Sequence, residues 1–159
     1  PPTFIENHIA LAESGFIVSG GRYHLSPAQT KLLLSGARPL SAAFKHWKFF
    51  RLPLGILRNL IGIRWRSVRT CNLGVFKVDF VSIGGFDESY LGWGREDSDF
   101  IVRLTRSGLK IRSARLAACV SHLHHEKRSR VQLSENHRKF FMTLDDPSRL
   151  LPRATIFSS

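Results

Sequence analysis

Residues 92–99 read Gly-Trp-Gly-Arg-Glu-Asp-Ser-Asp, and this run constrains the fold because a glycine-rich loop passes directly into an acidic helix start. Carboxylates suit the first turn of a helix, where they meet free backbone amides and the positive end of the helix dipole. An apolar stripe at helical spacing follows, formed by Phe100, Ile101 and Leu104. The sequence therefore predicts a helix that starts at the acids and ends before Gly108.

Capping explains one or two of the carboxylates, but it does not explain a tryptophan between two glycines. Glycines permit tight turns and a close approach of the backbone, and the indole of Trp93 suits stacking on a sugar ring. The alternative is a buried tryptophan that fixes the loop. On this run alone, a sugar-acceptor site with a carboxylate base and a structural tryptophan loop both remain open.

The neighbouring segments alternate between strand-like and helix-like patterns. Residues 71–76 predict a strand, 79–83 a short helical turn and 84–88 a tight loop. Short strands are predicted at 109–111 and 117–120, and a helix-like run is predicted through Phe141. The expected fold class is α/β.

Three motifs in this order carry a family resemblance: CNLGVF at 71–76, GGFDESYLGWGREDSD at 84–99 and VSHLHH at 120–125. They resemble the carboxy-terminal half of inverting GT-A glycosyltransferases. The pattern is similar to bacterial family 2 members and, more distantly, to β-1,4-galactosyltransferases, whose corresponding run is GWGGEDDD. The resemblance implies a partial GT-A domain, Rossmann-like with a mixed sheet, in which residues 1–145 form the acceptor-binding half and 146–159 a loosely structured tail.

The same resemblance predicts a missing amino-terminal half. In the family that half ends in a D-x-D motif that holds a divalent metal, followed by a proline-containing segment similar to residues 1–8. No D-x-D lies at or before Pro1, so we expect the chain to be cut just after that motif. Asp97-Ser98-Asp99 fits the letters but belongs to the acceptor motif. The chain opens without a basic and apolar secretory leader.

The resemblance assigns the acceptor chemistry to residues 93–97. Inverting transfer needs one carboxylate to take the acceptor proton, unlike most glycoside hydrolases, which need two. By resemblance Asp97 is this base and Glu96 bonds to the acceptor. Trp93 and Gly94 complete the predicted acceptor-binding residues.

A divalent cation, Mn²⁺ or Mg²⁺, is the implied cofactor. The histidine that completes the metal site in the family follows a strand after the Glu-Asp pair, which favours His122 here over His125, while His124 is expected to be exposed. Asn72 either holds neighbouring backbone or touches the donor sugar. Arg128 or Arg130 either meets donor phosphate oxygens or belongs to a solvated helix start.

Two cysteines, Cys71 and Cys119, occur in the chain. A zinc site built from Cys119 and the neighbouring histidines would need a second pair of ligands from elsewhere. We therefore expect reduced core thiols in a cytoplasmic protein.

Nearly all of the formal net charge of +12 comes from residues 14–78, because no Asp or Glu lies between Ser14 and Val78. Within this block, residues 38–66 interleave bases with aromatic and aliphatic residues, which is typical of a segment that lies at a membrane interface. Its longest apolar run is too short to cross a membrane. Three interpretations remain: contact with anionic lipid, a solvated basic face over core helices, and nucleic-acid binding. No recognised nucleic-acid motif supports the third.

We therefore expect an inverting hexosyltransferase-type enzyme that uses a nucleotide-sugar donor, with a UDP-sugar preferred, and a saccharide or glycolipid acceptor. Its expected context is lipopolysaccharide, capsule or other cell-envelope glycan synthesis. Its expected location is cytoplasmic, peripheral at the inner face of the cell membrane, without nucleic acid as a partner. The alternative is a noncatalytic acceptor- or lipid-binding module left by truncation, and a third class is a basic nucleic-acid or lipid-binding protein.

Overall fold

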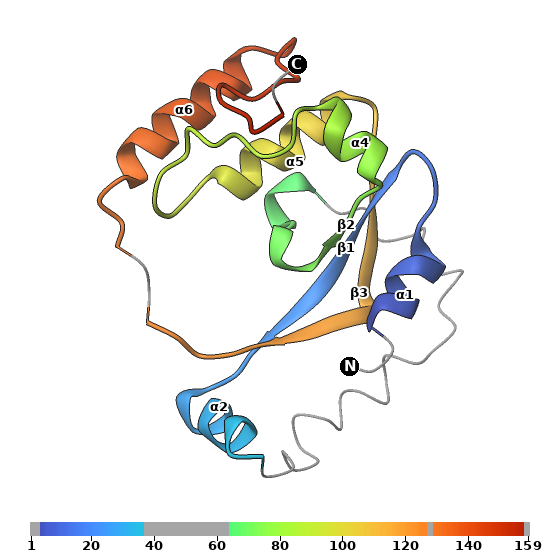
Figure 1. Ribbon diagram of the computed structural model, residues 1–159, viewed down its shortest axis with the longest axis vertical. Coiled ribbons are helices and arrows are strands. Elements are labelled where there is room, and N and C mark those ends of the chain that lie inside the picture. The colour runs from blue at the N-terminus through green and yellow to red at the C-terminus, as the bar shows by residue number, and fades with distance from the viewer. Residues whose placement is uncertain (1–3, 37–63, 127–128, 158–159) are drawn as a thin grey trace.

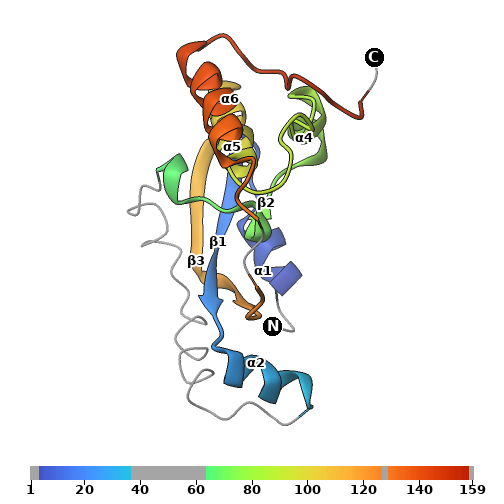
Figure 2. The same ribbon diagram turned by 90° about the vertical axis from the view of Figure 1, so that its left-hand side faces the viewer.

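The computed structural model describes residues 4–36, 64–126 and 129–157. Its elements, in chain order, are α1 (Phe4–Leu11), β1 (Phe16–His24), α2 (Pro27–Leu34), the 3₁₀ turns η3 (Trp65–Ser67) and η4 (Thr70–Asn72), β2 (Leu73–Gly74), α4 (Lys77–Ser82), α5 (Glu96–Arg106), β3 (Lys110–His122) and α6 (Leu133–Asp145). Helices α4, α5 and α6 gather at one end of the molecule and α2 lies at the other (Figures 1 and 2).

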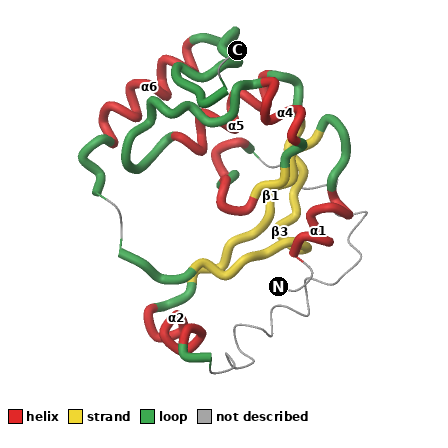
Figure 3. The backbone as a smooth tube through the Cα atoms, viewed as in Figure 1, coloured by secondary structure: helices red, strands yellow, loops and turns green. Residues whose placement is uncertain are grey.

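The strands form a mixed sheet with the order β2-β1-β3. Strand β1 pairs antiparallel with β2 and parallel with β3. The predicted α/β class with a mixed sheet is thus confirmed. A long loop connects α4 to α5 (Figure 3).

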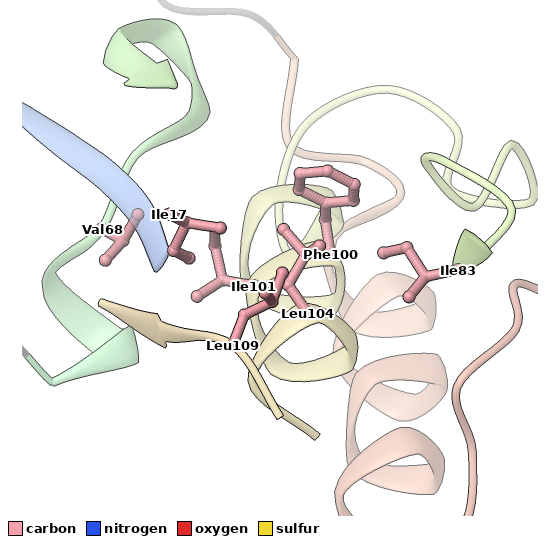
Figure 4. Packing of buried hydrophobic residues seen from close by; sticks show 7 residues of the cluster. All are labelled: Ile17, Val68, Ile83, Phe100, Ile101, Leu104 and Leu109. Carbon is pink, nitrogen blue, oxygen red and sulfur yellow. The ribbon is translucent and has the colours of Figure 1, made fainter. Parts of the chain in front are cut away.

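Successive residues of β1 contribute to two separate clusters because side chains alternate across a strand. Ile17 packs into the larger cluster, whose other buried members are Val68, Ile83, Phe100, Ile101, Leu104 and Leu109 (Figure 4). Val18 joins Leu11, Ala114 and Ala118 in the smaller cluster. The apolar stripe of α5 therefore anchors the helix, and with it the preceding acidic turn, to the sheet.

Helix α5 starts and ends where the sequence predicts, at Glu96 and before Gly108, whose φ is +98°. Two of its charged residues are fully buried. Asp99 accepts a 2.8 Å bond from Arg103, which also donates to the carbonyl oxygens of Ile83 and Gly85. Asp99 is therefore a structural residue, in contrast to Asp97 two positions earlier.

Strand β3 is one continuous element, whereas the sequence predicts two short strands. The register passes from Gly20 opposite Ala114 to Gly21 opposite Cys119, so extra residues of β3 bulge out between the two predicted segments. Gly20 accommodates this irregularity: a Cβ there would lie 2.4 Å from the Ala118 carbonyl oxygen and 2.3 Å from the Asn72 amide. Side chains in a bulge do not alternate regularly between the two faces of the sheet, so the sequence shows two short strand patterns where the structure has one strand.

Two further predictions need correction. Residues 71–76 contain only the two-residue strand β2, because the chain enters it through the turn η4. The predicted helical turn at 79–83 is confirmed as α4, which starts two residues earlier, at Lys77. Helix α6 continues four residues beyond Phe141.

The carboxy-terminal segment is docked, although residues 146–157 contain no helix or strand. Asp87, which is 3% exposed, accepts bonds from the backbone amides of Arg153 and Ala154 and pairs with the Arg153 guanidinium at 3.1 Å. Thr155 donates to the carbonyl oxygen of Gly84. The expectation of a loosely structured tail is therefore wrong for these residues, because a buried carboxylate on the 84–88 loop binds them.

We expect Asp87→Ala to destabilise the fold and release this segment. Burial alone would raise the pKa of Asp87, but bonds from Arg153, Ser89 and Ala154 outweigh it and hold the pKa below its ordinary value. The substitution removes the nearer of the two carboxylates that pair with Arg153, at 3.1 against 4.0 Å, at a cost of about 3 kcal/mol. Thermal denaturation and limited proteolysis measure the loss, with Glu88→Ala as the control.

The sign of the pH dependence follows from the lowered pKa. The Asp87 contribution is present above the unfolded-state pKa, about 3.9, and is lost as the pH falls through the lower folded-state value. Asp87→Ala should therefore flatten the acid limb of the stability profile. An unchanged acid limb and unchanged proteolysis would show that the segment is held by other contacts.

The division into residues 1–145 and a tail stays a prediction. Most of the predicted membrane-interface segment, residues 38–63, lies outside the described residues. In the part of the chain that is described, no helix is long and apolar enough to cross a membrane.

Candidate active site

The predicted acceptor residues line one cavity of about 490 Å³, which we call the Asp97 cavity. It brings together Trp93, Gly94, Glu96 and Asp97 from the loop before α5 and the first turn of that helix. The remaining walls come from β1, the η3 region and the start of α6: Arg22, Trp65, Arg66, Arg69, Arg95, Ser98, Arg130, Leu133 and His137. Trp93 is 42% exposed, so the buried-tryptophan alternative is wrong.

The two carboxylates of the cavity have different surroundings. Asp97 accepts a hydrogen bond at Oδ1 from the Thr70 hydroxyl. Glu96 has one carboxylate oxygen, Oε2, that is buried without a hydrogen-bond partner among the described residues. A buried acceptor of this kind is costly unless a ligand or water supplies a donor. Because Glu96 also lines the cavity, a rotation of its carboxylate would bring this oxygen to a ligand hydroxyl.

The loop before α5 has an unusual backbone. Gly92 and Gly94 have φ values of +73° and +112°, and Arg95 has a φ of +78°, the only positive value of a non-glycine residue in the described chain. The Asn136 amide of α6 donates to the carbonyl oxygens of Leu91 and Trp93, at 3.0 and 3.4 Å. These bonds fix the loop that presents the indole.

A second cavity of about 640 Å³, which we call the strand cavity, adjoins the first. It lies along β1 and β3 and is lined by residues that include Gly21, His24, Cys71, Asn72, Cys119 and Ser121. Arg22 and Arg69 line both cavities. The two guanidinium groups therefore mark the junction between them.

Asn72 holds backbone, the first of its two predicted roles. Its side-chain nitrogen donates to the carbonyl oxygens of Gly21 and Ala118, at 2.6 and 3.0 Å, and its oxygen lies 2.8 Å from Nε2 of His8. Both amide hydrogens are thus used in joining β1 to the bulge of β3. Asn72 still lines the strand cavity, but it has no donor left for a sugar hydroxyl.

His122 and His125 lie together at the end of β3, with their Nε2 atoms 3.1 Å apart. The other ring nitrogen of His125 lies 2.8 Å from the Glu126 carbonyl oxygen. Burial, followed by the positive charges of Arg22, His24 and His125, lowers the pKa of His122 below its ordinary value. The His122 imidazole can therefore offer a neutral nitrogen, while His124 is exposed as predicted.

The histidine pair fits part of a metal site. Two nitrogens about 2.1 Å from one ion, at a right angle, lie about 3.0 Å apart, close to the observed separation. His24 contacts His122 edge-on, at 4.9 Å between ring centroids. Within the described ranges, no group of three or more His, Cys, Asp or Glu side chains is placed to hold an ion. Further ligands would have to come from bound substrate or from other residues.

The cysteine prediction needs correction. Both thiols are free, but Cys71 is exposed and accepts a 3.5 Å bond from Arg22, so it is not a core residue. Cys119 is half-buried, and burial raises the pKa of its thiol. Cys71 lies in the turn η4 and not in a strand, so its side chain does not pack into the core.

Sequence reasoning missed Thr70 and the arginines of the junction. Thr70 precedes Asp97 by 27 positions, and no motif links the two residues. The run of bases between 14 and 78 was a signal for Arg22 and Arg69, but its three interpretations were lipid contact, a solvated basic face and nucleic-acid binding, and none of them was donor binding. The predicted donor residue Arg128 lies outside the described residues.

Residues 58–126 match the family model described as the N-terminal domain of galactosyltransferase. The match covers η3, η4, α4, α5 and β3, and therefore Thr70, Asp97 and His122. It supports a β-1,4-galactosyltransferase-like glycosyltransferase region, whose activity implies a nucleotide-sugar donor and a saccharide acceptor. No solved structure gives a significant match to the chain.

Proposed function

We propose that this chain supplies the acceptor-binding part and the catalytic base of an inverting GT-A glycosyltransferase. The enzyme transfers a hexosyl group from a nucleotide diphosphate sugar, with UDP as the preferred nucleotide, to a saccharide or glycolipid of the cell envelope. The supporting observation is that Trp93, Glu96 and Asp97 line one cavity, with Asp97 bonded to Thr70. The basic segment at 38–66 supports a peripheral position on the inner, anionic face of the membrane.

The proposed step begins with the acceptor hydroxyl in the Asp97 cavity. The Thr70 hydroxyl occupies Oδ1 of Asp97, which leaves Oδ2 to take the acceptor proton. The acceptor oxygen then forms a bond to the anomeric carbon as the bond from that carbon to the diphosphate oxygen breaks. The electron pair leaves with the nucleotide diphosphate, and attack from the opposite side inverts the configuration.

The leaving diphosphate needs positive charge nearby. The positions of Arg22 and Arg69, which line both cavities, support a donor in one cavity and an acceptor in the other. Guanidinium groups bind phosphate oxygens with two parallel hydrogen bonds and remain charged at any physiological pH. We assign the donor diphosphate to the strand cavity beside this pair.

His122 and His125 would hold the divalent ion, Mn²⁺ or Mg²⁺, at the end of the strand cavity near His24. When bound, the ion offsets charge on the diphosphate. The contact of His125 with the Glu126 carbonyl oxygen orients its ring toward His122.

Thr70→Val should lower kcat by about tenfold, the value of one hydrogen bond of about 1.4 kcal/mol, while the donor Kd stays unchanged. Thr70 acts as a positioning residue, because its hydroxyl holds the Asp97 carboxylate and does not reach the reacting atoms. Steady-state kinetics of the protein expressed from its complete reading frame measure the effect.

Thr70→Ser is the matched control, because it keeps the hydroxyl and should restore kcat. If Thr70→Ser is as slow as Thr70→Val, the side chain matters through packing and not through its bond to Asp97.

Calorimetry tests the donor part of the proposal. The protein from the complete reading frame should bind UDP in the presence of Mn²⁺, and His122→Ala should weaken this binding while a His124→Ala control does not. Absence of binding to UDP and to other nucleoside diphosphates would overturn the proposed donor class.

A further inference from the structure

The Asp97 cavity contains five arginines and two carboxylates: Arg22, Arg66, Arg69, Arg95 and Arg130 with Glu96 and Asp97. In the described part of the chain, each ion pair involves other residues, so none of these guanidinium groups has a carboxylate within 4.0 Å. Like charges gathered around one hollow repel each other unless a ligand of opposite charge enters. The cavity is therefore suited to an anion.

Three of these arginines line the Asp97 cavity but not the strand cavity, and each lies over an aromatic ring. Arg66 lies 4.5 Å from the Trp65 ring centroid, Arg95 5.4 Å from that of Phe140, and Arg130 4.8 Å from that of Trp93. Stacking uses the face of the guanidinium and leaves its N–H edges available for a carboxylate or phosphate. It also limits the conformational freedom that binding would otherwise have to remove.

Arg95 occupies a backbone position that favours glycine. Its φ of +78° costs a non-glycine residue of order 1 kcal/mol or more. Backbone strain of this kind gathers at functional sites, and here it holds a guanidinium at the wall of the cavity, which indicates a function for that group. Because Arg95 directly precedes Glu96 and Asp97, that function belongs to the acceptor side of the cavity.

We propose that the acceptor is an acidic saccharide, whose carboxylate or phosphate is bound by Arg66, Arg95 and Arg130 while its hydroxyl reaches Asp97. This inference rests on the proposed function for the role of Asp97. The donor diphosphate does not account for these three arginines, because they line the Asp97 cavity and are absent from the strand cavity. Arg22 and Arg69 remain for the diphosphate.

The test compares matched ligands in the absence of donor. The protein from the complete reading frame is titrated with methyl β-glucuronide, methyl β-glucoside and methyl β-glucoside 6-phosphate, and Kd values are measured by NMR. At least one acidic ligand should bind about tenfold more tightly than the neutral glucoside, as expected for one charge-assisted contact. The tighter of the two acidic ligands identifies the anion as carboxylate or phosphate.

Arg95→Gly is the informative variant because it relieves the positive φ, so it should fold at least as well as the natural chain. The acidic and neutral ligands should bind this variant with nearly equal Kd values. Lys31→Gln, which removes one charge from the exposed face of α2, should keep the preference. Equal affinities in the unsubstituted protein, or equal losses in both variants, would overturn the inference.

The two proposals fail separately. Acidic preference without sugar transfer from any nucleotide sugar would keep the acidic ligand and overturn the enzymatic proposal. Transfer to neutral acceptors, with no preference for an acidic ligand, would overturn the acidic acceptor and keep the enzyme.

Discussion

Asp97→Asn is expected to lower the rate of sugar transfer by 10²–10⁴-fold, the usual contribution of a positioned general base. Asparagine keeps the shape of the side chain and can still accept the bond from Thr70, but it cannot take the acceptor proton. The melting temperature and the donor Kd should therefore stay close to those of the unsubstituted protein. Steady-state kinetics and calorimetry measure the two quantities separately.

Glu96→Gln provides the matched comparison at the neighbouring position. Its buried Oε2 is assigned to binding the acceptor and not to proton transfer, so the acceptor KM should rise more than kcat falls. Near-normal turnover by Asp97→Asn would remove Asp97 as the base. If Glu96→Gln alone lost all turnover, that role would pass to Glu96.

Arg103→Ala is expected to have the largest effect on folding. Arg103 and Asp99 are both fully buried, and the guanidinium also satisfies the carbonyl oxygens of Ile83 and Gly85. Removal of one partner from a buried pair costs about 3–5 kcal/mol, a large part of a total stability of about 5–15 kcal/mol. The variant should melt far below the unsubstituted protein or fail to fold.

Asp99→Asn should also destabilise the fold, since it weakens the bonds to Arg103 and Thr143. The control is Arg138→Ala, because the Arg138–Glu135 pair is exposed on α6 and its loss should change the melting temperature little. If Asp99→Asn lost transfer without losing stability, the roles assigned to Asp97 and Asp99 would have to be exchanged.

Local patterns predicted the elements whose cause is local. The acidic start, the apolar stripe and Gly108 were sufficient for α5, because capping and helical periodicity are properties of neighbouring residues. The same run placed Trp93, Glu96 and Asp97 in one site, since they lie within five positions of one another. Burial separated Asp97 from Asp99, and no sequence pattern indicated which carboxylate faces the core.

The features that sequence did not predict depend on contacts between distant segments. The bulge of β3 needs the space left by the missing side chain of Gly20, and it lies against the Asn72 amide. The docked segment after α6 depends on its hydrogen bonds to Asp87. The Thr70 bond to Asp97 and the Arg22 position at the junction likewise join separate parts of the chain. Such pairs cannot be read from spacing in one sequence.

The most direct test of the central claim is NMR analysis of the reaction product. The protein from the complete reading frame, supplied with Mn²⁺, α-linked UDP-sugars and an acidic saccharide acceptor, should form a β-linked product, and Asp97→Asn should form almost none. An α-linked product, or transfer at an unchanged rate by Asp97→Asn, would contradict the assignment of the Asp97 cavity as the site of an inverting glycosyl transfer.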